Sequence, residues 1–97
     1  MSAYLILDVE IHDQEKYAEY MKLARPLVEK YGGKYHVRGG PFEIMDGDWS
    51  PTRLVVIEYP DMETAKAMYN GDEYAPIKAI RMSCSTGHTV IVEGGMV

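Results

Sequence analysis

The stretch KYHVRGGPFEIMDGDWSPTRLVVIEYP, residues 34–60, contains the strands around which the rest of the chain can be arranged. Branched apolar and aromatic residues predict strand in its first and last parts, and Gly39-Gly40-Pro41 predicts a bend in the first part. Asp46-Gly47 is typical of a turn. We therefore expect a central antiparallel hairpin, with strand at residues 34–39, 42–45 and 52–60.

A strand and a helix are predicted before this hairpin. AYLILDVEI, residues 3–11, is rich in branched apolar residues, which favours a strand. Asp13 is a suitable helix N-cap, and apolar residues then recur every three or four positions until Gly32-Gly33 ends the helix. Pro26 lies inside this pattern, so we expect a kink there.

After the hairpin, the sequence predicts two further helices and a last strand. Asp61 is expected to cap the first helix, and Asp72 to cap a shorter one with Pro76 in its first turn. HTVIVEG, residues 88–94, reads as the last strand. The order β-α-β-β-α-β predicts an α+β, ferredoxin-like sandwich with a four-stranded antiparallel sheet and its helices on one face. We expect one domain, residues 1–97.

The charge balance excludes two classes of partner. The chain has ten Lys and Arg residues against fifteen Asp and Glu, and a formal net charge of −5. Nucleic-acid binding and anionic membrane surfaces both require clustered basic residues, so we expect neither partner. No apolar run is long enough for a transmembrane helix, and the N-terminus does not resemble a signal peptide. We expect a cytoplasmic protein.

Alternation along the strands separates two sets of side chains. Each strand has one apolar set, which we expect to face the helices. These sets are Leu5, Leu7 and Val9; Tyr35 and Val37; Val55, Ile57 and Tyr59; and Val90 and Val92. The opposite sets are mixed, because they combine Ile6, Leu54, Val56 and Ile91 with Asp8, His36, Arg38, Glu58 and Glu93.

A mixed face of this kind is too apolar to be simply solvated and too charged to be a core. Large apolar patches usually mark an interface. We therefore expect a homodimer in which two sheets pack face to face. The space between them would be a partly apolar cavity with a few ionisable groups, which is typical of a small-molecule site.

Five short segments follow one another over nearly the whole chain: YHVRGG, DGDW, PTRLVVIEYP, MYNGDEYAPIKAIR and VIVEG. In this order and spacing they resemble the domain-of-unknown-function 1330 family. The resemblance implies a ferredoxin-like fold that dimerises as an α+β barrel. The superfamily of dimeric α+β barrels includes cofactor-free monooxygenases, muconolactone isomerases and haem enzymes. The 1330 family itself has no established reaction. Arg38, Gly39, Gly40, Glu58, Tyr74 and Arg81 fall on the family's motif positions.

Three ionisable groups and one arginine are the candidates for chemistry between the sheets. Arg38 would hold a carboxylate or enolate, because its guanidinium is always charged and forked; alternatively it pairs with Glu58 or Asp8. His36 would transfer a proton, with Glu58 or Asp8 orienting it or moving the proton itself. Alternatively His36 is an interface residue with all its hydrogen bonds satisfied.

Further candidates for contact with a ligand come from the ends of the predicted cavity. Tyr74 and Arg81 are two helical turns apart and could close one end, although core packing and a surface ion pair are the alternatives. Trp49 could cover the cavity or pack across the dimer, and Tyr4 lies in the mixed set of the first strand. The histidines lack ligand spacing, and Gly39-Gly40 does not precede a helix. We therefore expect neither a metal nor a cofactor.

Three functions remain open from the sequence. The chain could be a cofactor-free isomerase or monooxygenase acting on a small carboxylated or enolisable compound. It could bind a small organic acid without catalysis. It could also be a purely structural dimer whose charged groups are all paired internally.

Overall fold

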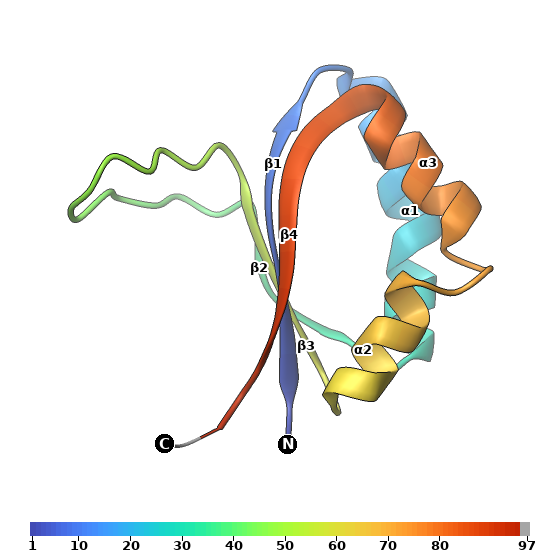
Figure 1. The fold of residues 1–97 in the computed structure, drawn as a ribbon. Coiled ribbons are helices and arrows are strands. Elements are labelled where there is room, and N and C mark those ends of the chain that lie inside the picture. Colours follow the sequence, from blue (N-terminus) through green and yellow to red (C-terminus); the bar gives the residue numbers. More distant parts are fainter. Residues whose placement is uncertain (96–97) are drawn as a thin grey trace.

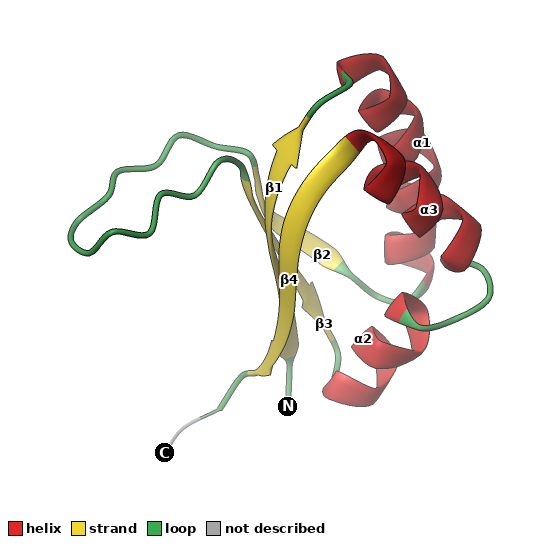
Figure 2. Cartoon of the chain, turned by 45° about the horizontal axis from the view of Figure 1, so that its top comes forward, coloured by secondary structure: helices red, strands yellow, loops and turns green. Residues whose placement is uncertain are grey.

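The computed structural model describes residues 1–95 and has the ferredoxin-like α+β fold expected from the sequence (Figure 1). Its elements are β1 (Ala3–Ile11), α1 (Gln14–Lys30), β2 (Lys34–Arg38), β3 (Leu54–Tyr59), α2 (Met62–Tyr69), α3 (Ala75–Cys84) and β4 (Ser85–Glu93). The sheet is antiparallel with the strand order β2-β3-β1-β4. The helices cover one face of this sheet (Figure 2). No helix or strand of residues 1–95 covers the opposite face, here called the open face.

Two of the three predicted helix caps are confirmed. The Asp13 side chain accepts from the Lys16 backbone N–H at 3.2 Å, and the Asp61 side chain accepts from Thr64 at 2.7 Å. The prediction for Asp72 is wrong, because α3 begins at Ala75 without a side-chain cap. Pro lies in the first turn of α3, where its fixed φ favours a helix start, so the helix begins there and not at the preceding turn.

The core lies between the sheet and the helices, as predicted for β1 and β3. The inward residues of these two strands are buried against the apolar stripe of α1. They are Leu5, Leu7, Val9, Val55, Ile57 and Tyr59. Because burying a Leu, Ile or Val side chain contributes about 1.5–3 kcal/mol, this set fixes which face of each strand meets the helices.

The predicted faces of β4 are wrong. Its register pairs Leu5 with Ile91 and Ile6 with Val90, so Ile91 packs against the core while Val90 lies on the open face with 57 % of its surface exposed. Val92 is also on the open face. All three residues are apolar, so the sequence does not distinguish the two alternations. The direct passage from α3 into β4 at Ser85 sets the register instead.

A bulge in β2 reverses the predicted alternation after His36. Tyr35 pairs with Ile57 but Val37 pairs with Val56, so two steps along β2 match one step along β3. A bulge of this type inserts one residue and turns the following side chains to the other face. Val37 therefore lies on the open face and the next residue, Arg38, lies on the helix side.

The predicted strand at 42–45 is also wrong. Residues 39–53 form a long loop that projects from the open side of the sheet (Figure 1). Gly39 ends β2 with a φ of +72°, and an added Cβ would lie 2.6 Å from the Arg53 side chain. Within the described part of the chain, the alternating apolar residues of FEIM pair with no strand, so their pattern alone does not make one.

Candidate functional site

On the open face, His36 and Glu58 contact each other. His36 Nε2 lies 2.8 Å from Glu58 Oε1, and the Ser2 hydroxyl donates to Glu58 Oε2 at 2.6 Å. Hydrogen bonds from Ser2 and then from His36 lower the pKa of Glu58, so this carboxyl is ionised at neutral pH. Tyr4 is the cross-strand neighbour of Glu58 on the same face.

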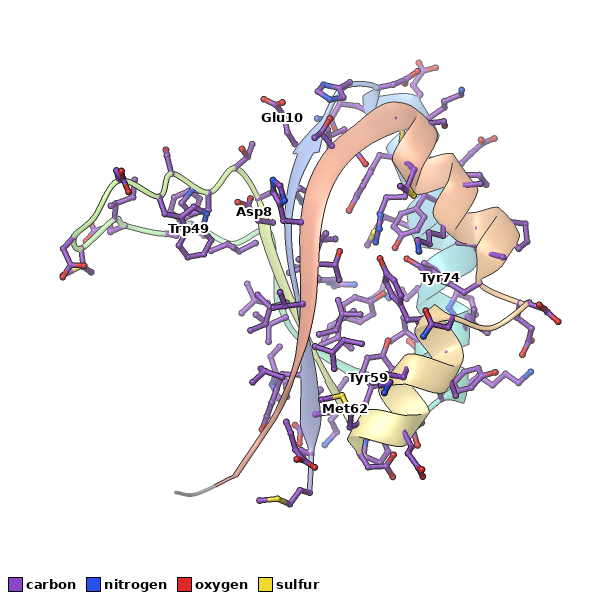
Figure 3. The ribbon with its side chains drawn as sticks, viewed as in Figure 1. Asp8, Glu10, Trp49, Tyr59, Met62 and Tyr74 are labelled. Carbon is purple, nitrogen blue, oxygen red and sulfur yellow. The ribbon has the colours of Figure 1, made fainter. Side chains whose placement is uncertain are left out.

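Asp8 does not join this pair, because both of its carboxylate oxygens bind the base of the projecting loop. Asp8 Oδ2 accepts from Trp49 Nε1 at 3.2 Å, and Oδ1 accepts from the backbone N–H of Thr52 at 2.8 Å. Figure 3 shows Asp8 and Trp49 side by side on the loop side of the sheet. Asp8 and Trp49 therefore position the loop, and the partner of His36 is Glu58.

Arg38 does not lie on the same face as His36. Its guanidinium is over the ring of Tyr35, 5.3 Å from the centroid. Neither of the ion pairs considered for it, with Glu58 or with Asp8, is formed. The bulge described above is the physical reason, since it turns Arg38 toward the helix side. The predicted placement of Arg38 between two sheets is wrong.

Tyr74 and Arg81 do contact each other, but on the helix side of the sheet. Arg81 Nη1 donates to the Tyr74 hydroxyl at 3.2 Å, and both residues are buried. Figure 3 places Tyr74 and Tyr59 on the helix side of the sheet, away from Asp8 and Trp49. The prediction that these two residues close a cavity between two sheets is therefore wrong, and they belong to the core side.

Arg81 is a buried cation without a carboxylate partner among residues 1–95. Only 6 % of its surface is exposed, and none of the ion pairs in this part of the chain includes it. Its hydrogen bonds go to two tyrosine hydroxyls, Tyr74 at 3.2 Å and Tyr69 at 3.0 Å. Buried charges are normally paired with an opposite charge, so a guanidinium held only by tyrosine hydroxyls is unusual.

The tyrosine hydroxyls around Arg81 form a connected group. The Tyr20 and Tyr74 hydroxyls are 2.8 Å apart, and the ring of Tyr74 lies 5.4 Å from that of Tyr69. Burial raises the pKa of Tyr74 despite the nearby charge of Arg81, so Tyr74 is neutral at physiological pH. Burial also opposes ionisation of Tyr69, but hydrogen bonds from Arg81 and Thr89 and the charge of Arg81 lower its pKa. None of these three side chains is a carboxylate, the group that usually accompanies a buried guanidinium.

A cavity between the sheet and the helices meets this group. Its lining, which defines the helix-side cavity, consists of Leu5, Leu7, Tyr17, Tyr20, Met21, Val28, Tyr35, Val55, Ile57, Tyr59, Met68, Tyr74 and Arg81. The centres of water molecules can occupy about 20 Å³ of it, which is room for about one water. A larger ligand therefore enters only when lining side chains move, and the unbranched Met21 and Met68 are suited to such movement.

Other groups with possible chemistry do not form a site in the described residues. Cys84 is buried, and burial raises the pKa of its thiol, so it is not a thiolate at neutral pH. No three His, Cys, Asp or Glu side chains in residues 1–95 are grouped to hold a metal ion. None of the helices described for residues 1–95 has the length and apolar character needed to span a membrane.

Apart from Tyr74, the tyrosines of the cavity are functional candidates that were not selected from the sequence. Tyr17 and Tyr20 contribute to the apolar stripe of α1, and a stripe of this kind is usually core. A signal was nevertheless present, because the chain has eight Tyr residues and one Phe. Phe would fill the same buried positions, so the repeated choice of Tyr indicates that the hydroxyl groups form hydrogen bonds there.

The fold and the site together define a ferredoxin-like α+β protein with a tyrosine-lined cavity on the helix side of its sheet. The chain belongs to the family described as domain of unknown function DUF1330, whose model matches residues 2–95. No curated protein matches the chain.

Several solved structures share this fold. A protein of unknown function from Rhodopseudomonas palustris has a TM-score of 0.79 at 17 % identity, over 99 % of this chain and 84 % of that one. A dimeric ferredoxin-like protein of unknown function from Jannaschia sp. CCS1 has a TM-score of 0.72 at 12 % identity, over 97 % and 100 %. SnoaB, a cofactor-independent oxygenase from Streptomyces nogalater, has a TM-score of 0.68 at 9 % identity, over 99 % and 95 %. At these identities the similarity concerns the fold.

Proposed function

We propose that the chain forms a homodimer through its open face and that each protomer binds a small organic anion in the helix-side cavity. We further propose that it acts on this compound as a cofactor-independent oxygenase or isomerase. The observation that carries the proposal is Arg81, a buried guanidinium at the wall of a cavity. Within residues 1–95, its side chain has only tyrosine hydroxyls as hydrogen-bond partners.

A carboxylate or enolate in the cavity would supply the missing counter-charge. Leaving a buried charge without an opposite charge costs several kcal/mol, and a charged hydrogen bond returns about 1.5–3 kcal/mol. The rest of the lining is largely apolar or aromatic, which favours a compact ring or branched chain attached to the anionic group. Arg81 would thus hold the anion in the role considered from the sequence for Arg38.

The cavity also restricts the chemistry, because none of its lining groups is a ready base. Burial is the main cause that raises the pKa of Tyr17, Tyr59 and Tyr74, and it raises that of Tyr35 to about 12. His36 and Glu58 lie on the opposite face of the sheet. We therefore propose a substrate that already carries an enolate or phenolate at neutral pH, stabilised by Arg81. Molecular oxygen would then add to its electron-rich carbon to give a peroxide, which takes a proton from water and loses water to leave a carbonyl group. In an isomerase, water would protonate that carbon instead and release hydroxide.

The same absence of a lining base favours one second candidate, a non-catalytic protein that binds organic acids. Both candidates use the same cavity and the same arginine. They differ in whether the bound compound is converted, so turnover separates them.

The homodimer is proposed from the side chains of the open face. Ile6, Val56, Val90 and Val92 form an apolar area on this face, with the His36–Glu58 pair beside it. Sheets pack face to face about 10 Å apart, and a second copy supplies a matching surface by symmetry. The dimeric ferredoxin-like protein from Jannaschia supports this proposal as a relative in fold.

The test is a panel of small aromatic and enolic acids, each with a neutral amide analogue. We expect thermal stabilisation by acids, none by their amides, and a dimer in light scattering at micromolar concentration. Oxygen uptake with the acids, or an isomer detected by mass spectrometry under nitrogen, would support the enzyme. Binding without conversion would favour the non-catalytic candidate, and no binding by any acid would contradict both.

A further inference from the structure

We propose that Tyr20 is the residue that donates a hydrogen bond to the anionic oxygen of the ligand, at the end of a one-way chain of hydrogen bonds from Arg81 through Tyr74. This inference rests on the proposed function, because it names the groups that bind the anion in the same helix-side cavity. The three residues, here called the donor chain, all line that cavity.

The direction of the donor chain follows from the first hydrogen bond. A guanidinium has five N–H donors and no acceptor, so Arg81 can only donate to the Tyr74 oxygen at 3.2 Å. The hydroxyl hydrogen of Tyr74 must then point elsewhere, and the Tyr20 oxygen lies 2.8 Å away. The 2.8 Å contact taken alone allows either direction. Accepting from the guanidinium makes the Tyr74 hydroxyl a stronger donor and its oxygen a weaker acceptor, so the arrangement in which Tyr74 donates to Tyr20 is favoured over one in which both neighbours donate to Tyr74.

The hydrogen of Tyr20 is left as the free end of the donor chain. Its oxygen accepts from Tyr74, and no other hydrogen bond of its side chain is found in residues 1–95. Tyr20 is buried and its ring is held at 5.3 Å from that of Tyr17 and 6.5 Å from that of Tyr74. A buried donor that is fixed in place and has no acceptor of its own is suited to an oxygen atom of a ligand.

The charge of Arg81 strengthens this donor. Each member of a hydrogen-bonded chain polarises the next, by about 10–30 % per bond in condensed phases, and the low dielectric of the interior preserves the effect. Donors fixed in advance at a developing oxyanion are the usual means by which proteins stabilise it. Tyr20 and Arg81 would thus favour an enolate, phenolate or carboxylate over a neutral carbonyl.

Tyr69 provides a matched control within the same group. It accepts from the other end of the guanidinium at 3.0 Å, but it does not line the cavity and is not part of the donor chain. Tyr69→Phe and Tyr74→Phe each remove one hydroxyl bonded to Arg81. Only Tyr74→Phe interrupts the path to Tyr20, so the two variants separate the donor chain from a general loss of support for the arginine.

The experiment measures Kd by calorimetry for benzoate and for benzamide with the full chain. We expect Tyr20→Phe to bind benzoate about 10- to 100-fold more weakly, as expected for a lost charged hydrogen bond, and benzamide nearly as well as the wild type. Tyr74→Phe should weaken benzoate in the same direction, and Tyr69→Phe should leave it nearly unchanged. The double variant Tyr20→Phe/Tyr74→Phe should bind benzoate no more weakly than Tyr20→Phe, because both changes break one chain.

Retained binding of benzamide shows that the cavity of each variant is folded. The inference is overturned if Tyr20→Phe keeps the wild-type affinity for benzoate, or if the Tyr20 and Tyr74 effects are additive. In that case the proposed function stands as long as the wild type prefers benzoate to benzamide. Binding of neither probe to the wild type would overturn the proposed function, and the donor chain with it.

Discussion

Replacing Arg81 by Met tests whether the buried guanidinium is there for stability or for a ligand. Met matches the aliphatic part of the arginine side chain and is apolar, so it fills that part of the space without the charge. The change removes two hydrogen bonds from a charged donor, to Tyr69 and Tyr74, each worth about 1.5–3 kcal/mol. It also removes the cost of burying a cation without a carboxylate, which is several kcal/mol. These terms largely offset, so we expect stability within about 2 kcal/mol of the wild type.

Urea denaturation followed by circular dichroism measures this difference. Leu7→Ala is the reference for real damage to the core, because Leu7 is buried and such truncations cost about 2–5 kcal/mol. Benzoate at ten times its Kd should stabilise the wild type by about 1.4 kcal/mol and should leave Arg81→Met unaffected. An Arg81→Met protein that loses as much stability as Leu7→Ala and still responds to benzoate would refute the assignment of Arg81 to a ligand.

Three further outcomes follow from the packing, the open face and the cited pKa. Gly33→Ala should destabilise the chain by about 1–3 kcal/mol in urea, because an added Cβ would lie 2.5 Å from Val28 Cγ1, whereas Gly40→Ala, with no atom within 4 Å, should not. Val92→Glu should give a monomer in light scattering, while Leu23→Glu on α1 should leave the dimer intact; equal dissociation by both would contradict an interface on the open face. The pKa of Glu58 is lowered in the fold, so its contribution to stability is present above its unfolded pKa of about 4.3 and is lost as pH falls further. Glu58→Gln should flatten this acid dependence in urea titrations between pH 6 and pH 3, and an unchanged slope would show that Glu58 is not its source.

The fold could be predicted from the sequence because several independent signals agreed. The helix bounds were marked by the caps Asp13 and Asp61 and by the glycines at the end of α1. The strands β1 and β3 each have one apolar set of side chains, so only one face of each could meet the helices. The faces of β4 could not be predicted, because Val90, Ile91 and Val92 are all apolar. Either face of the strand would therefore present apolar side chains to the core. The reversal at Arg38 could not be predicted either, since a bulge at a residue such as His36 leaves no mark in the sequence pattern.

The candidate site was predicted in part, and the difference has a physical cause. His36 and Glu58 lie on the neighbouring strands β2 and β3, at positions that alternation alone assigns to the open face. Arg81 lies near the end of a helix, where an arginine usually faces solvent, and its burial depends on how α3 packs against α1. The tyrosine hydroxyls that surround it come from α1, α2 and the start of α3, so only the tertiary structure shows that they meet.

The position of a bound anion tests the central claim most directly. A crystal structure of the protein with benzoate should place the carboxylate on the helix side of the sheet, within hydrogen-bonding distance of the Arg81 guanidinium and the Tyr20 hydroxyl. Benzoate located on the open face, against His36 and Glu58 and away from Arg81, would contradict the account.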